Sequence, residues 1–283
     1  MLNDFFKLNQ GYVEICSPEE LRAHLNTSRH LLNIAYMPDT LVREKLENVI
    51  FEEVSFSKTT LKNVTIKNCK FINCLFIGTV FERCSIHNSN FNNCNFFKCK
   101  FRETYAKPFQ FKSAITNKDF SNIAVSLFNE LRNQYKEDSQ REFKSEAEYY
   151  FHKWKRVEDL NSSRKENQAW YKYTPRRVSS FLHYILFGFG YRLRNLIATT
   201  LSALGLMVFI NHHYAAMIFT EISPSDESII KSIYFTITTM ATLGASGVSN
   251  FTEFGYIIVV INVLVGISLL TFTANSILNR VVR

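Results

Sequence analysis

Two long stretches of the sequence contain no Asp, Glu, Lys or Arg, namely residues 196–219 and 254–278. An α-helix rises about 1.5 Å per residue, so each stretch can cross a hydrocarbon core of about 30 Å with some tilt. A chain that is water-soluble throughout is therefore excluded. We expect an integral membrane protein with transmembrane helices over about residues 195–219 and 254–279.

Several functional motifs are also missing. The N-terminus has no basic segment followed by a continuous apolar run, so we expect no cleavable signal peptide and a front half that remains in the cytoplasm. The sequence contains no P-loop, nucleophile elbow, metal-ligand cluster or suitably placed pair of acids. We therefore expect no enzymatic activity, no catalytic or metal site and no cofactor.

The surplus positive charge, +8 over the chain, is concentrated before the first apolar stretch. Between Arg141 and Arg194, twelve Lys and Arg stand against six Asp and Glu. The link between the stretches carries mainly acids: Glu221, Asp226, Glu227 and Glu253 against Lys231. The positive-inside rule then places both termini in the cytoplasm, and we expect the bacterial inner (plasma) membrane. Nucleic acid is an alternative partner for the basic segment, but its position beside a span favours anionic lipid headgroups.

Residues 46–101 follow a period of five, which neither a helix nor a strand has. A large apolar residue recurs at Leu46, Phe51, Phe56, Leu61, Ile66, Phe71, Phe76, Phe81, Ile86, Phe91, Phe96 and Phe101. Smaller residues stand two positions before these from Val49 onward. The pattern resembles the pentapeptide-repeat family. That resemblance implies a short right-handed quadrilateral β-helix over residues 46–111, with large residues stacked inside.

Five of the six cysteines occupy the small-residue position of this repeat: Cys69, Cys74, Cys84, Cys94 and Cys99. An even number of regularly spaced cysteines can mark disulfides or a metal site. Here the spacing follows the repeat, where a thiol serves as a compact hydrophobe, and a reducing cytoplasm disfavours disulfides. We expect these cysteines to fill the core.

The other cytoplasmic segments are expected to be helical. Residues 1–45 form an N-terminal cap, in which Ser17-Pro18-Glu19-Glu20 opens a short helix. Residues 112–175 form a helical linker with two amphipathic helices separated near Asp138-Ser139, and residues 176–194 an interfacial helix. The expected fold class is thus mixed: a β-helix and cytoplasmic helices before an α-helical two-span domain over residues 195–283.

A shorter apolar segment, residues 228–247, lies between the two spans, contains several threonines and ends in glycines. It is too short and polar to cross a membrane. A re-entrant segment is tolerated at membrane depth where protein buries it or where it lines water. The order of span, half-helix, Thr/Gly turn and span is the order that a pore requires.

The segment Thr242-Leu243-Gly244-Ala245-Ser246-Gly247 resembles the filter of two-transmembrane potassium channels, Thr-Val-Gly-Tyr-Gly, which follows a Thr-rich pore helix. The resemblance extends to Gly266, where that family keeps a flexible glycine. It implies a homotetramer in which these six residues form the filter. Ala245 and Ser246 depart from the pattern: alanine cannot brace the filter as tyrosine does, and serine resists positive φ. We expect weak discrimination between K⁺ and Na⁺.

Helical spacing on the second span selects a pore-lining set: Asn262, Gly266, Leu270, Thr273 and Ile277. For Gly266, a hinge and close helix packing remain alternatives. The repeat domain can bind a cytoplasmic regulator or only assist assembly. A second reading of the whole chain is a membrane-anchored repeat scaffold that conducts no ions. DNA mimicry by the repeats is disfavoured, because residues 46–107 carry nine basic and five acidic side chains.

Overall fold

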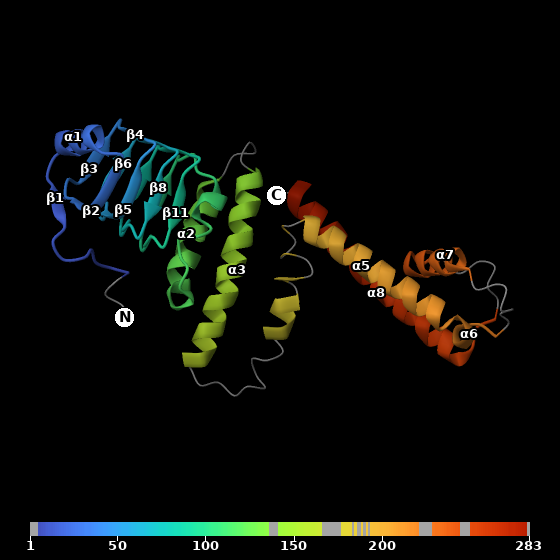
Figure 1. Cartoon of the computed structure of the whole chain (residues 1–283). Coiled ribbons are helices and arrows are strands. Elements are labelled where there is room, and N and C mark those ends of the chain that lie inside the picture. The colour runs from blue at the N-terminus through green and yellow to red at the C-terminus, as the bar shows by residue number, and fades with distance from the viewer. Residues whose placement is uncertain are drawn as a thin grey trace. The chain divides into compact units, whose positions relative to one another are not determined.

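The computed structural model describes residues 5–135, 141–165, 177–182, 184–185, 188, 191, 193–220, 228–243 and 250–281. The chain divides into two compact units, Met1–Val178 and Ser179–Arg283, each of which is described by itself (Figure 1). The first unit combines short strands with helices, and the second is helical. This division agrees with the contrast in charge that the sequence shows between its two parts.

The first unit is built on parallel strands that form three sheets, in the orders β1-β2-β5-β8-β11, β10-β7-β4 and β12-β9-β6-β3. The strands are β1 (Val13–Ile15), β2 (His30–Tyr36), β3 (Thr40–Val42), β4 (Lys45–Glu47), β5 (Ile50–Ser55), β6 (Thr60–Lys62), β7 (Thr65–Lys67), β8 (Lys70–Ile72), β9 (Val80–Glu82), β10 (Ser85–His87), β11 (Asn90–Asn92) and β12 (Lys100–Arg102). Phe51 pairs with Phe71, and Phe71 with Phe91. The offset between these partners is four five-residue repeats, so the period of the sequence sets the sheet register.

Large apolar side chains form ladders inside the strand region. Phe51, Phe71, Phe91 and Phe111 stack with successive ring centroids 4.8, 4.7 and 4.6 Å apart. A second ladder contains Phe56, Phe76 and Phe96. These rings are buried, and burying one phenylalanine side chain contributes about 1.5–3 kcal/mol. The ladders therefore supply much of the stability of the first unit.

The backbone turns at every fifth residue. Non-glycine residues with positive φ recur from position 43 onward: Arg43, Asn48, Glu53, Lys58, Asn63, Asn68, Asn73, Arg83, Asn88, Asn93, Lys98 and Glu103, with Gly78 completing the series. Asparagine tolerates the left-handed region better than most residues, which accounts for its frequency here. One left-handed residue per repeat changes the chain direction after each short strand and thereby produces the five-residue period.

The stacked strands begin earlier than the expected position, Leu46. Leu31 pairs with Phe51 and Leu41 with Leu61, so strands β2 and β3 already belong to the sheets. These leucines fit the five-residue spacing. The expectation missed them because the small residue of the repeat is replaced by a charged one in this part. Asp39 and Glu44, for example, stand two positions before Leu41 and Leu46.

Helices lie at both ends of the strands. Helix α1 (Pro18–Thr27) begins as the sequence predicts: the Glu20 amide donates to Ser17 Oγ at 3.2 Å, and Glu20 Oε2 accepts from the Cys16 amide at 2.7 Å. Beyond β12 come two 3₁₀ turns, η1 (Pro108–Phe111) and η2 (Lys118–Phe120), then α2 (Ser121–Gln134) and α3 (Arg141–Lys165). The expected break near residue 138 lies outside the described residues. Of the expected interfacial helix, residues 177–182 are described and helical.

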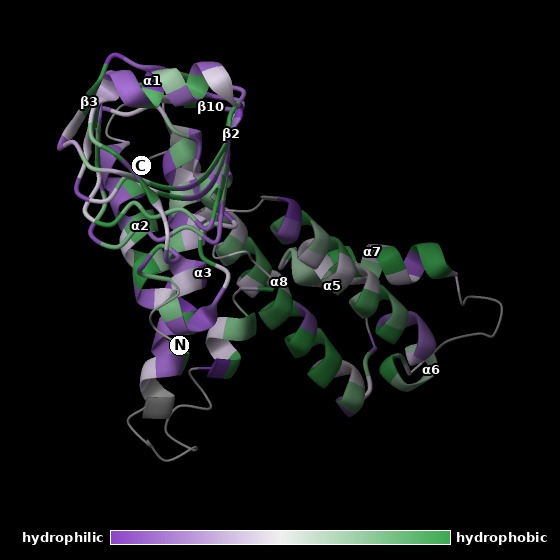
Figure 2. Cartoon of the chain, turned by 60° about the vertical axis from the view of Figure 1, so that its left-hand side comes forward, coloured by the Kyte–Doolittle hydropathy of each residue, from purple (hydrophilic) through white to green (hydrophobic). Residues whose placement is uncertain are grey.

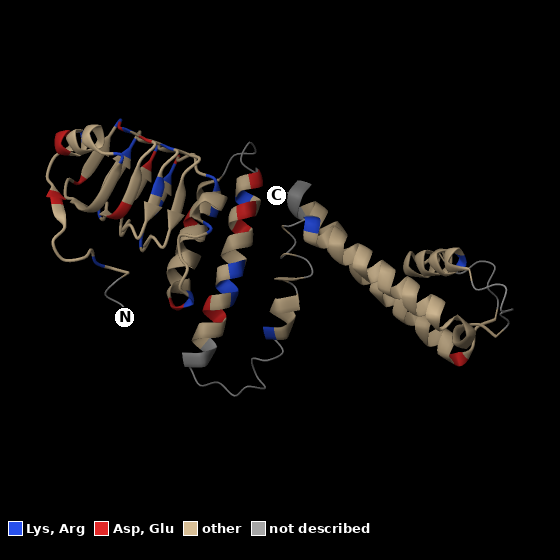
Figure 3. Ribbon diagram, in the orientation of Figure 1, with Lys and Arg blue, Asp and Glu red and all other residues tan. Residues whose placement is uncertain are grey.

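The second unit contains four described helices: α5 (Leu193–His213), α6 (Ala215–Ile218), α7 (Ile229–Met240) and α8 (Glu253–Val281). Two segments, Arg194–His213 and Glu253–Leu278, are long and apolar enough to cross a membrane. Figure 2 shows hydrophobic residues along α5, α7 and α8, whereas Figure 3 shows charged residues gathered on the strands and α3. The expected two spans and the shorter helix between them are thus present.

The phenylalanine ladder generates a stability prediction. Phe76 is fully buried between Phe56 and Phe96, so Phe76→Ala should lower the free energy of unfolding of the first unit by about 3–5 kcal/mol. Phe109 is half-exposed, and Phe109→Ala should cost no more than about 1 kcal/mol. Urea-dependent proteolysis of the detergent-solubilised chain measures both. Equal losses for the two variants would contradict the ladder as the stabilising core.

The cysteines generate a reactivity prediction. Cys16 is exposed, whereas the other five thiols are buried, and burial raises the pKa of the Cys94 and Cys99 thiols well above the usual value. Only a thiolate attacks an alkylating reagent. Iodoacetamide at neutral pH should therefore modify Cys16 alone in the native chain and all six cysteines after denaturation, as counted by mass spectrometry. Rapid native modification of Cys94 would contradict the core assignment.

Candidate functional site

Helix α7 is the short helix between the two membrane-length helices, and its threonines face the interior. Thr236 and Thr239 are buried, and each hydroxyl donates to a carbonyl one turn earlier, Ser232 O and Phe235 O, both at 2.7 Å. These bonds satisfy the hydroxyl protons within the helix itself. A polar half-helix can thus be enclosed by apolar neighbours without leaving a donor unpaired.

The C-terminus of α7 ends in a Schellman turn. The Leu243 amide donates to Thr238 O at 3.0 Å and the Thr242 amide to Thr239 O at 3.1 Å, while Thr242 has a φ of 59°. A positive φ is a genuine outlier for a β-branched residue and costs of order 1–3 kcal/mol. The turn satisfies two carbonyls of the last helical turn and directs the chain away from the helix at Thr242.

The structure describes two of the six expected filter residues. Thr242 occupies the Schellman turn, and Leu243 follows as a residue that is 76% exposed. Gly244, Ala245, Ser246 and Gly247 lie outside the described residues. The expected filter therefore begins where α7 ends, and its geometry beyond Leu243 stays a prediction.

Helix α8 approaches α7 and α6 through two glycines. A Cβ at Gly266 would lie 2.0 Å from Met240 O, the last residue of α7, and a Cβ at Gly255 would lie 2.2 Å from Ile218 O. Both distances are impossible for a real side chain, so glycine is required at both positions if the helices are to approach this closely. Of the two alternatives for Gly266, the close contact supports helix packing.

An apolar cluster holds the same helices together nearer the start of α8. Ile218, Phe235 and Ile258 form its buried centre, and Phe219 and Phe251 pack against it. The rings of Phe219 and Phe235 are 5.1 Å apart, and Phe219 and Phe251 form an antiparallel bridge. This cluster ties α6, α7 and α8 to one another and fixes α7 between the spans.

Residues of the expected pore-lining set differ in exposure. Leu270 and Ile277 are 73% and 51% exposed on α8, and Thr273 is half-buried. Asn262 is fully buried inside this unit. The burial of Asn262 distinguishes it from the other members of the set, which helical spacing alone selected. The lining of a pore between several copies of the chain stays a prediction.

Sequence reasoning missed a second buried asparagine. Asn211 on α5 donates from Nδ2 to Thr236 Oγ1 at 2.7 Å and is almost fully buried. Beside it, His212 Nδ1 lies 3.3 Å from Ser232 Oγ. The available signal was a lone asparagine within an apolar span, since buried polar groups in membrane helices usually have a partner or a function.

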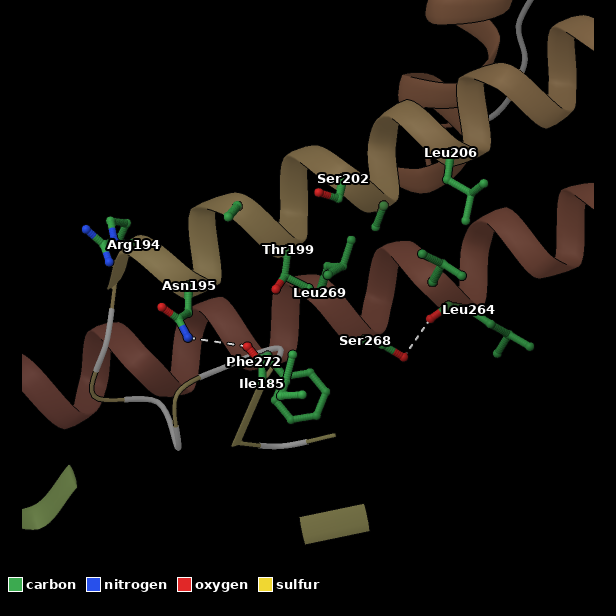
Figure 4. Close-up of a pocket in the computed structure, with 13 residues that line it drawn as sticks. Ile185, Arg194, Asn195, Thr199, Ser202, Leu206, Leu264, Ser268, Leu269 and Phe272 are labelled. Carbon is green, nitrogen blue, oxygen red and sulfur yellow. Dashed lines mark hydrogen bonds between the residues drawn. The ribbon is translucent and has the colours of Figure 1, made fainter. Parts of the chain in front are cut away.

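A groove of about 670 Å³ runs between α5 and α8 (Figure 4). It is lined mainly by apolar side chains, with Arg194 and Asn195 at one end, and the Asn195 amide donates to Ile185 O at 3.3 Å. On α5 its lining extends from Arg194 to Leu206, whereas α7 bonds to α5 at Asn211. The groove is therefore separate from the α7 turn.

No group of three or more His, Cys, Asp or Glu able to hold a metal ion occurs among the described residues. The side-chain hydrogen bond between α5 and α7 joins two neutral groups, the Asn211 amide and the Thr236 hydroxyl. Such groups orient a helix through dipoles rather than fixed charges.

Two membrane-length helices flank a shorter helix that ends in a threonine turn, and this order of elements is typical of the pore domains of two-transmembrane ion channels. Residues 196–283 match the family model described as an ion channel. Residues 25–101, which contain most of the parallel strands, match the model of the SV2A/B/C luminal domain. No curated protein matches the chain. The second unit is thus similar to two-transmembrane channel domains, which supports an ion-channel function.

The close helix contacts generate a matched pair of variants. Gly266→Ala forces a methyl group into Met240 O and should destabilise the second unit by about 1–3 kcal/mol. Gly205→Ala on α5 meets nothing within 4 Å and should be neutral or stabilising by up to about 1 kcal/mol. Thermal melting in detergent compares them. A Gly266→Ala melting temperature equal to that of Gly205→Ala would contradict the close approach.

Proposed function

We propose that the chain is the subunit of a homotetrameric cation channel with a weakly selective filter, gated or assembled through its N-terminal repeat domain. The observation that carries this proposal is the α7 turn: a half-helix ends at Thr242 between two membrane-length helices, inside the segment that the ion-channel model matches. One chain supplies one filter segment. A closed ring of carbonyls needs several copies, which a rotationally symmetric assembly provides.

The orientation of α7 suits cations. A helix carries partial negative charge at its C-terminus, and α7 ends at Met240, two residues before Thr242. Four such ends pointing towards one axis would favour a cation there. The proposed ligands are the Thr242 side chain and the carbonyls of Leu243 and Gly244, with residues 245–247 completing the filter.

Weak selectivity follows from what replaces the usual filter residues. Ala245 stands where related filters have tyrosine, and a methyl group cannot brace the backbone from behind. Ser246 stands where they have glycine. Positive φ costs serine more than glycine, so the same backbone is less favourable. We propose a filter that admits both K⁺ and Na⁺.

Below the filter, the proposed cavity lining is Leu270, Thr273 and Ile277 on α8. Leu270 and Ile277 are exposed and lie two helical turns apart, with Thr273 between them. This spacing places the three residues along one side of the helix. Gly266, one turn earlier, contacts α7 and would set the angle at which this lining enters the pore.

For the first unit we propose a right-handed, four-sided β-helix. Three sheets account for three sides, and the bridges from Ser55 to Leu75 and from Leu75 to Asn95 support a fourth. A coil of this kind provides a rigid surface for a cytoplasmic regulator or for contacts that assist assembly. Gating input is proposed to reach the pore through this unit.

We further propose that both termini face the cytoplasm of a bacterial cell, with the filter towards the outside of the inner membrane. The basic segment before α5 then lies at the inner surface, where anionic lipid headgroups attract Lys and Arg by about 1 kcal/mol each. Arg194 at the start of α5 and Glu253 at the start of α8 lie at opposite ends of the spans, as this orientation requires.

The deciding measurement is the reversal potential of the purified chain in planar bilayers with K⁺ on one side and Na⁺ on the other. A potential close to zero is expected, because the filter admits both ions. Gly244→Ala should abolish or alter the current, whereas Gly205→Ala, outside the pore, should leave it unchanged.

Each other outcome has a definite meaning. A strongly K⁺-selective potential would overturn the weak filter while keeping the channel. Absence of current from a chain that is folded and tetrameric by mass photometry would overturn conduction. It would favour instead a membrane-anchored repeat scaffold.

A further inference from the structure

Asn262 on α8 is fully buried in the second unit. Neither its Nδ2 nor its Oδ1 has a hydrogen-bond partner among the residues that the structure describes. An unpaired buried amide is unfavourable, and replacing it with an apolar side chain of the same shape is often neutral or stabilising. A polar residue at this depth of a membrane helix therefore points to a function other than stability.

The packing of α8 on α7 locates the surroundings of Asn262. One turn before it, Ile258 belongs to the cluster that contains Phe235, and one turn after it, Gly266 abuts Met240 O. Because α7 advances from residue 235 to 240 between these contacts, Asn262 lies level with the turn of α7 that carries Thr236 and Thr239. Both threonines are buried.

Thr236 shows how an asparagine can hold this helix. Its hydroxyl donates to Ser232 O at 2.7 Å and accepts from Asn211 Nδ2 at 2.7 Å. Thr239 makes the same donation, to Phe235 O at 2.7 Å. Its oxygen lone pairs therefore remain available as acceptors, and Asn262 Nδ2 is an unused donor on the neighbouring helix.

We propose that Asn262 is a positioning residue of the pore, whose Nδ2 donates to Thr239 Oγ1 in the conducting state. Two asparagines, Asn211 on α5 and Asn262 on α8, would then hold successive turns of α7, one from each span. This inference rests on the proposed channel function. In the structure the bond from Asn211 is formed and that from Asn262 is not.

The bond connects the lining helix to the filter. Thr239 accepts the Thr242 amide through its carbonyl, in the turn that begins the filter segment. A small rotation or shift of α8 makes or breaks the contact between Asn262 and Thr239. The end of α7 is thereby held or released. Such a contact gives the pore two discrete arrangements, which coupling between a helix and a filter requires.

Single-channel recording of the full tetramer tests the bond. Asn262→Leu and Thr239→Val each remove one partner and should lower the ratio of open to closed probability about fivefold, the factor that corresponds to one neutral hydrogen bond of about 1 kcal/mol. The double variant should show no further loss, because the two residues act through one bond. Thr239→Ser keeps the hydroxyl and should restore the wild-type value.

Controls separate positioning from folding. Thr200→Val removes a hydroxyl that bonds to Leu196 O on α5 and should leave open probability unchanged. Asn262→Leu should retain or raise the melting temperature, since an unpaired amide is removed. If it fails to fold, Asn262→Ala, which also lacks the Nδ2 donor, takes its place in the double variant with Thr239→Val. Thr239→Ser then shows that the Thr239 effect comes from the hydroxyl, and the absence of further loss in the double variant assigns it to the bond with Asn262.

Two results would overturn the inference while the channel stands: variants whose ratio of open to closed probability stays within twofold of wild type, or a double variant whose loss is the product of the single losses. A wild-type tetramer that carries no current would overturn the channel function and this inference together. The reversal potential of the wild type between K⁺ and Na⁺ is therefore measured before the variants. A failure of the channel function is then distinguished from a failure of the proposed bond.

Discussion

The close approach of α8 to the last turn of α7 is the contact on which the second unit depends. Because Gly266 has no side chain, the α8 backbone lies against Met240 O. This contact fixes the position of the end of α7 along α8. The Schellman turn can then begin the filter segment at Thr242. The same contact sets the register that brings Asn262 level with Thr239. One missing methyl group therefore determines three features of the proposed pore.

The first unit depends on a five-residue repeat in which the backbone turns and the buried side chains recur at the same interval. One left-handed residue per five turns the chain, and one large apolar side chain per five fills the interior. Asn68 and Asn48, and likewise Asn93 and Asn73, are joined by side-chain hydrogen bonds along the turns. Because every repeat satisfies the same conditions, each short strand is specified even though it is only three residues long in most cases. Cysteine serves here as a small apolar residue.

Much of this architecture was predictable, for identifiable reasons. The spans follow from the absence of charge, helix α1 from its capping residues, and the ladders from the period of five. Other features depend on tertiary contacts that no spacing reports. Helical periodicity selected Asn262 as a pore-lining residue, whereas the structure buries its side chain inside the unit. The left-handed Thr242 was not foreseen, because sequence preferences disfavour positive φ for threonine. The early strands β2 and β3 were missed because charged neighbours obscured the repeat.

The twenty-residue offset between paired strands also constrains how the first unit can change in length during evolution. Inserting or deleting twenty residues adds or removes one strand from each sheet, and every later strand keeps its sheet. A change of five residues preserves the local pattern but moves all later residues to the next side. The helices after β12 would then meet a different surface. Whole-layer duplication is therefore the route by which such a domain can vary its reach without disturbing its two ends.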